Sequence, residues 1–188
     1  MQAVFVLLFC HLVHFVFGCT PFIEHDQSRF CRNDHAFSGI VRFSRVSDSE
    51  AVFQIQVIRN IKGGVTFPNG LITVYGRGEL HSCGATRLNQ GQRYILYVSP
   101  NDNRLSVNHY QEASPINFNR IRRYDCSCEI EIDLPQQSFP NNSIPARDKC
   151  IITEQEFGCT FWNGFCSRAA SRYGPRGACQ WVPGRSVC

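Results

Sequence analysis

Hydrophobic and polar residues alternate along several short runs in the first two thirds of the chain. In AVFQIQVI the apolar Phe53, Ile55 and Val57 alternate with Gln54 and Gln56. This period of two is typical of a strand with one buried face. Turn-forming sequences such as KGG, PNG, NQGQ and SPNDN separate the runs. Five strands are predicted, at residues 36–46, 51–58, 70–78, 93–99 and 104–110.

Five strands without long helices predict a mainly β fold, and a five-stranded OB-type barrel is the simplest closed form. A short helix is expected after the last strand, within residues 114–124. Ser114 can cap it, Pro115 suits its first turn, and Ile116, Phe118 and Ile121 form an apolar stripe.

The remaining residues, 127–188, differ in composition, because six cysteines fall in about sixty positions. A segment this small cannot bury a sufficient core without covalent support. We therefore expect a barrel domain at 19–126 and a small disulfide-rich, mostly irregular subdomain at 127–188. Cys126 and Cys128 form the joint between them.

The first eighteen residues are apolar and contain no Asp, Glu, Lys or Arg. His11 and His14 interrupt the run, and Gly18 stands at its end, as in a secretory signal peptide cleaved after residue 18. An uncleaved anchor and a bacterial lipoprotein box are the alternatives. Asn141 begins an Asn-Asn-Ser glycosylation acceptor, which favours a secreted, glycosylated chain.

Cysteine counting agrees with cleavage. The sequence has eleven cysteines, and loss of Cys10 with the leader leaves an even number. No C-x-x-C knuckle occurs in the sequence, so disulfides in an oxidising, extracellular compartment are favoured over a zinc ribbon. The ten are Cys19, Cys31, Cys83, Cys126, Cys128, Cys150, Cys159, Cys166, Cys179 and Cys188.

The net charge and the sequence motifs limit the classes of function to consider. The formal net charge of +4 permits weak attachment to extracellular matrix or acidic glycans but gives no argument for nucleic acid. No protease, hydrolase or nucleotide-binding motif occurs in the sequence, so an enzyme is not expected, and a secreted hydrolase is the least favoured class. The mature chain's histidines, His25, His35, His81 and His109, are isolated and are assigned surface or structural roles.

Cleavage after Gly18 would leave Cys19 with a free α-amino group. Such an amine is partly deprotonated at neutral pH, so its nitrogen can bind zinc, and the carbonyl of the same residue can complete a five-membered chelate. A catalytic zinc keeps one position open for water, which this chelate could displace in another protein's active site. The alternative is that Cys19 only anchors the end of a strand.

Specific residues follow Cys19 at defined spacings: Thr20, His25, Gln27, Phe30, Cys31 and Asp34, then Lys62 with Gly63, Cys83 with Gly84, Arg122 with Arg123, and Cys126 with Cys128. With these the chain resembles the tissue inhibitors of metalloproteinases, as a divergent member. The resemblance covers the mature chain, more loosely after Cys128. It implies a netrin-like OB-type barrel and a protein that inhibits secreted or membrane-anchored zinc metalloendopeptidases as a monomer.

The resemblance also implies a mechanism. Cys19 would chelate the catalytic zinc of the protease, and the chain would hold no cofactor of its own. Thr20 would enter the specificity pocket, Pro21 and Phe22 would follow the cleft, and residues 80–83 would form the second edge of a wedge. The wedge comprises Cys19, Thr20, Pro21, Phe22, Leu80, His81, Ser82 and Cys83.

The disulfides implied by the resemblance are Cys19–Cys83, Cys31–Cys126, Cys128–Cys188, Cys150–Cys166 and Cys159–Cys179. The chain departs from the family at Pro21, where a cysteine is usual, and it has Tyr110 and no cysteine in the segment that would hold the partner. The wedge therefore has one covalent tie fewer.

The competing interpretation is a secreted netrin-like interaction module that binds matrix, a glycan or a receptor without potent inhibition. Arg120, Arg122 and Arg123 could contribute to such a surface, or could simply form a solvated helix face.

Overall fold

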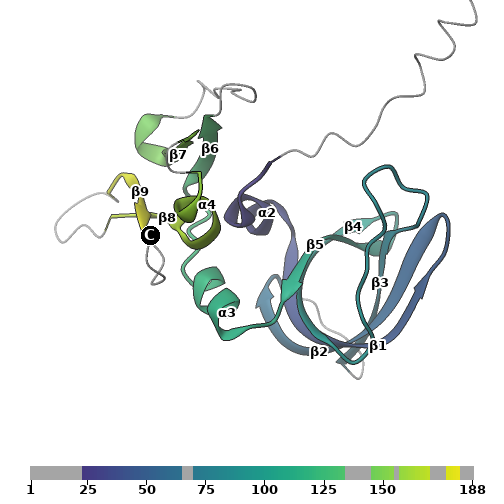
Figure 1. Cartoon of the computed structure of the whole chain (residues 1–188). Coiled ribbons are helices and arrows are strands. Elements are labelled where there is room, and N and C mark those ends of the chain that lie inside the picture. Colours follow the sequence, from purple (N-terminus) through teal and green to yellow (C-terminus); the bar gives the residue numbers. More distant parts are fainter. Residues whose placement is uncertain (1–22, 65–69, 134–144, 155–156, 170–176, 183–188) are drawn as a thin grey trace, which may run out of the picture.

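The first part of the chain folds into a closed barrel (Figure 1). The computed structural model describes residues 23–64, 70–133, 145–154, 157–169 and 177–182. The strand order is β1-β2-β3-β5-β4, and β4 returns to pair with β1. The strands are β1 (His35–Val46), β2 (Glu50–Lys62), β3 (Leu71–Arg77), β4 (Arg93–Asn101) and β5 (Arg104–Glu112).

The pairing is that of an OB-type barrel. β3 and β5 meet in parallel, with Tyr75 opposite Ser106, while the other neighbours in the barrel are antiparallel. The predicted mainly β fold with a five-stranded barrel and short helices is thus confirmed.

The barrel interior follows the alternation seen in the sequence. Phe53 and Ile55 are completely buried and Val57 packs against the same cluster, whereas Gln54 lies on the exposed side. The other fully buried residues of this cluster are Phe37, Val41, Ala51, Val74, Leu96 and Val98.

Two short helices pack outside the barrel. α3 (Pro115–Ile121) begins where it was predicted, because the Ser114 hydroxyl accepts a hydrogen bond from the Asn117 amide. Phe118 and Ile121 join a second apolar cluster, but Ile116 is 74% exposed, so the predicted stripe is wrong at that position. α2 (Asp26–Arg32) was not predicted.

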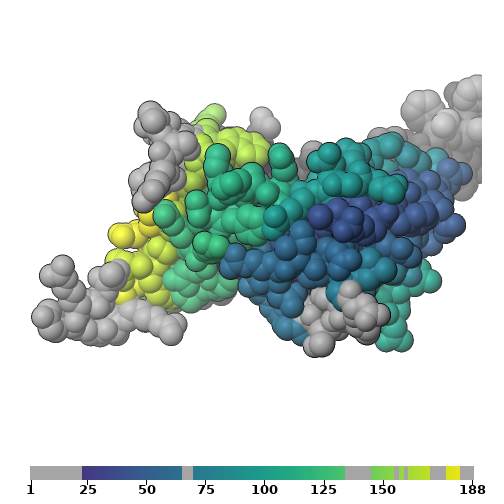
Figure 2. Space-filling model, turned by 90° about the horizontal axis from the view of Figure 1, so that it is seen from below, coloured from purple at the N-terminus to yellow at the C-terminus, as the bar shows by residue number. Residues whose placement is uncertain are grey.

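The region after Cys126 contains more regular structure than expected. β6 and β7 pair in parallel, and β8 and β9 pair antiparallel. These residues, green to yellow in Figure 2, lie at one end of the molecule, and Figure 1 places α2 between them and the barrel. The elements are β6 (Glu129–Asp133), a 3-10 turn η2 (Ala146–Asp148), β7 (Lys149–Thr153), α4 (Cys159–Asn163), β8 (Phe165–Arg168) and β9 (Cys179–Val182).

Within the described ranges, no helix has the length and apolar character needed to cross a membrane.

Candidate functional site

The structure describes one half of the predicted wedge, residues 80–83 in the loop after β3. All four residues are exposed, and Leu80 is 79% exposed, the highest value among the exposed large apolar side chains of the described residues. Residues 19–22, the other half, lie outside the described residues. Any role for Cys19 and Thr20 therefore stays a prediction.

The loop after β3 is held against the turn between β1 and β2. The backbone amide of Leu80 donates to the carbonyl of Asp48 at 3.0 Å, and that of Glu79 donates to Ser47 at 2.9 Å. A β-carbon at Gly78 would lie 2.5 Å from the Asp48 oxygen, so only glycine allows this approach. The exposed residues thus rest on a fixed support.

Inside the loop, His81 has a local structural role. Its Nδ1 accepts a hydrogen bond from the Cys83 amide at 3.0 Å, and its carbonyl accepts one from the Gly84 amide at 2.8 Å. Cys83 is disulfide-bonded. This state is compatible with the predicted Cys19–Cys83 bridge, which stays a prediction because Cys19 is not described.

The His and Gln that follow Cys19 in the sequence motif are buried. His25 caps α2 by accepting the Gln27 amide at Nδ1, 3.1 Å away. Its ring meets those of Phe161 and Trp181 edge to face, with centroids 5.5 Å apart in both cases. Burial lowers the pKa of His25 to about 4 from its usual 6.5. His25 is therefore a neutral core residue, in line with the structural role predicted for it.

The buried His25 should make stability fall with acid. In the unfolded chain His25 is protonated below pH 6.5, but in the folded chain it stays neutral down to about pH 4. The free energy of unfolding therefore rises with pH across this window, by about 3 kcal/mol in total. Urea unfolding at pH 7 and pH 4.5 measures it. His25→Asn, which keeps a capping oxygen but does not titrate, should show a clearly smaller loss, and an unchanged loss would refute this assignment.

Asp26 is the centre of a buried hydrogen-bond network. Its Oδ2 accepts from the hydroxyls of Tyr124 (2.6 Å) and Tyr97 (3.1 Å), from Arg120 (2.9 Å) and from the Gln111 amide (3.2 Å). These donors come from β4, β5, α3 and the segment after α3, so Asp26 ties the start of the described chain to the barrel and to the joint.

His109 completes this network. Its Nε2 lies 3.4 Å from Oδ1 of Asp26, and its Nδ1 lies 3.2 Å from Arg29. Since arginine can only donate, Nδ1 is the acceptor and Nε2 carries the proton. Burial alone would raise the pKa of Asp26, but the donors of His109 and Tyr124 and the charge of Arg120 outweigh it and hold that pKa well below its usual range.

Gln27 joins the barrel side of the molecule to the C-terminal region. Its Oε1 accepts the Cys166 amide at 2.8 Å, and its Nε2 donates to the carbonyls of Cys166 (2.8 Å) and Asp125 (3.0 Å). The side-chain amide thus pairs with both backbone groups of Cys166, as a neighbouring strand would. Like His25, it is a structural residue.

Lys62 and Gly63, another pair of the sequence motif, contact the end of α2. The Lys62 ammonium donates to the carbonyls of Phe30 (3.0 Å), Cys31 (2.7 Å) and Asn33 (2.5 Å), which uses all three of its protons. Gly63 has a φ of +68°, and a β-carbon there would meet the backbone oxygen of Asp34 at 2.5 Å. The pair fixes the helix end rather than forming a ligand site.

Three disulfides lie within the described residues. Cys31–Cys126 and Cys150–Cys166 form as predicted. The third joins Cys128 to Cys179, so the predicted pairs Cys128–Cys188 and Cys159–Cys179 are wrong.

Cys179 pairs with Cys128 because of the β8–β9 pairing, which places Cys179 opposite Arg168. The Arg168 side chain in turn bonds the carbonyl and hydroxyl of Ser127, both at 2.9 Å. Cys179 is thereby brought beside Cys128, with 5.8 Å between the two Cα atoms.

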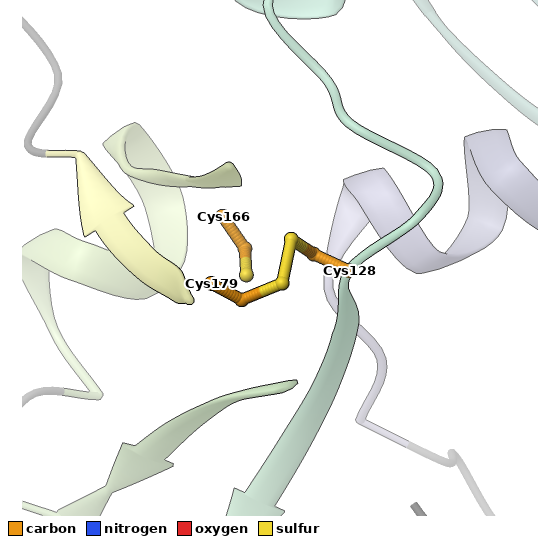
Figure 3. A group of neighbouring side chains, drawn as sticks. All are labelled: Cys128, Cys166 and Cys179. Carbon is orange, nitrogen blue, oxygen red and sulfur yellow. A yellow bond between two sulfur atoms is a disulfide. The ribbon is translucent and has the colours of Figure 1, made fainter. Parts of the chain in front are cut away.

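The sulfurs of Cys128, Cys166 and Cys179 gather in one place (Figure 3), all within 4.8 Å of one another. All three belong to disulfides, one to the Cys150 bridge and two to each other. Zinc binds cysteine as a thiolate, so this cluster is a covalent core of the C-terminal region and not a metal site.

The surface predicted at Arg120, Arg122 and Arg123 does not include all three arginines in the structure. Arg120 is only 17% exposed and belongs to the Asp26 network. The Arg123 guanidinium lies 5.7 Å from the centre of the Phe165 ring, and Arg122 is exposed. Of the three, Arg120 is therefore not available on the surface. Asn141 lies outside the described residues.

No protein-family model matches the chain, and no curated protein matches it. A function can therefore be inferred only from the residues and geometry of this chain.

Proposed function

We propose that this chain is a secreted inhibitor of zinc metalloendopeptidases and that Cys19 binds the catalytic zinc of the protease. The observation that carries the proposal is the loop at residues 80–83. It is exposed, it is fixed to the β1–β2 turn, and it ends in a disulfide-bonded cysteine. The disulfides of the described residues are consistent with an oxidising compartment.

The zinc chemistry comes from the terminus. The amine and carbonyl of Cys19 would replace the water on a zinc held by three protein ligands. Thr20 would point into the neighbouring specificity pocket, and Pro21 and Phe22 would run along the cleft. The residues at 80–83 would contact the protease from the other side of a Cys19–Cys83 bridge.

Rigidity decides how strong such an inhibitor can be. A wedge ordered before binding loses less conformational entropy when the complex forms. The backbone hydrogen bonds of Glu79 and Leu80 supply this order at the second edge. At the first edge Pro21 fixes its own φ, which offsets part of the stiffness that a second cysteine bridge would give.

The proposal is tested by titrating an active matrix-type metalloproteinase with protein whose first residues have been sequenced as Cys-Thr-Pro. Inhibition should saturate near one inhibitor per protease. Absence of inhibition across a panel of zinc endopeptidases, with the disulfides intact, would reject the proposal. The interaction module that binds matrix, a glycan or a receptor would then be the better interpretation.

A further inference from the structure

Three arginines from three elements line a groove between the barrel and α3. They are Arg59 on β2, Arg93 on β4 and Arg122 at the end of α3, and all three are exposed. The groove has a volume of about 380 Å³. Its other lining residues are Ala113, Pro115, Phe118 and Asn119, so the lining contains no carboxylate.

The barrel strands position two of the three arginines, and all three are available for a ligand. Arg59 and Arg93 lie on the two strands that flank β1, where Arg59 is in register with Ser38 and Arg93 with Ile40. The Arg93 guanidinium lies 5.6 Å from the centre of the Phe118 ring, which orients it. Among the described residues, none of the three arginines forms an ion pair with a carboxylate.

We infer that this groove binds the sulfate esters of an anionic polysaccharide. A guanidinium presents paired N–H donors that match the oxygens of an oxyanion. One sulfated sugar carries several such groups on a single ring, which suits three cations in one groove better than the single charges of an acidic peptide. Pro115 and Phe118 offer apolar contact to the sugar ring. This site is independent of the proposed inhibition.

The test compares two double variants that lose the same charge. Arg59→Gln with Arg122→Gln removes two groove arginines and leaves Arg93 on its ring. Arg42→Gln with Arg45→Gln removes two exposed arginines of β1 that do not line the groove. Binding of a heparin-derived oligosaccharide should weaken at least about tenfold in the groove variant, because charge-assisted hydrogen bonds are lost. In the control it should change by no more than about threefold, because only long-range attraction is reduced.

Equal losses in both variants would overturn the proposal, because they would show attraction by net charge alone. Equal binding of desulfated oligosaccharide or of an acidic peptide would also overturn it, since the ligand would not be a sulfate ester. Figure 1 places α3 and the loop after β3 on opposite sides of the barrel. The groove variant should therefore keep full protease inhibition, so failure of one proposal can be told from failure of the other.

Discussion

Addition of one alanine before Cys19 should lower the affinity for a zinc metalloendopeptidase by at least about a thousandfold, or roughly 4 kcal/mol. The extension converts the terminal amine to an amide, whose nitrogen has no free lone pair for zinc. The extra residue would also occupy the space of the zinc-bound water. Inhibition constants of the native and extended proteins, measured against the same protease, give the result.

The control for this experiment is the fold. The extension leaves the barrel and its disulfides unchanged, so the two proteins should unfold at the same temperature and have the same disulfide map. A correctly folded extended protein that inhibits as well as the native one would contradict zinc chelation by Cys19.

Replacement of Asp26 by Asn should lower the free energy of unfolding at pH 7 by about 3–5 kcal/mol, as expected when one partner of a buried ion pair is removed. The variant leaves Arg120, 17% exposed, without its carboxylate partner. It also replaces the carboxylate, whose Oδ2 accepts hydrogen bonds from Tyr97, Tyr124 and Gln111, by a neutral amide. Denaturant unfolding measures the change.

The matched control is Glu79→Gln, which breaks the ion pair with Arg87 on the surface. There the side chains are 40% and 66% exposed, so the expected loss is below about 1 kcal/mol. Because the pKa of Asp26 is held below its usual 3.8, its contribution is present above about pH 4 and is lost as the pH falls further. Equal losses for the two variants would show that the Asp26 network does not stabilise the junction.

The barrel could be predicted from the sequence because its strands are long and one face is buried. In β2, a strand of 13 residues, Ala51, Phe53 and Ile55 are buried at every second position, and this stretch carries the pattern. The C-terminal strands β8 and β9 have four residues each, which is too short for a period to show. α2 was missed for a related reason: only Gln27 and Phe30 are buried in its seven residues.

The disulfide errors have a different origin. The resemblance implied Cys31–Cys126 and Cys150–Cys166, and both bridges form. Cys128, however, is bonded to Cys179. That bond depends on the β8–β9 register and on the contact between Arg168 and Ser127. Neither follows from the spacing of cysteines along the chain.

Only a contiguous segment of the candidate site could be named in advance. The loop at 80–83 was implied by the resemblance, and its four residues are exposed in the structure. By contrast, the donors to Asp26 lie 71 to 98 positions away in sequence, and the groove arginines lie on three separate elements. No pattern in the sequence links such distant positions, because folding alone brings them together.

The most direct test of zinc chelation is a titration of a cobalt-substituted metalloproteinase followed by its visible absorption spectrum. Cobalt(II) in the zinc site reports its own ligands, so replacement of bound water by the amine and carbonyl of Cys19 should change the spectrum until one equivalent is bound. The protein extended before Cys19 should leave the spectrum unchanged. Saturating inhibition by the native protein with no spectral change would contradict the account, because the inhibitor would then bind without touching the metal.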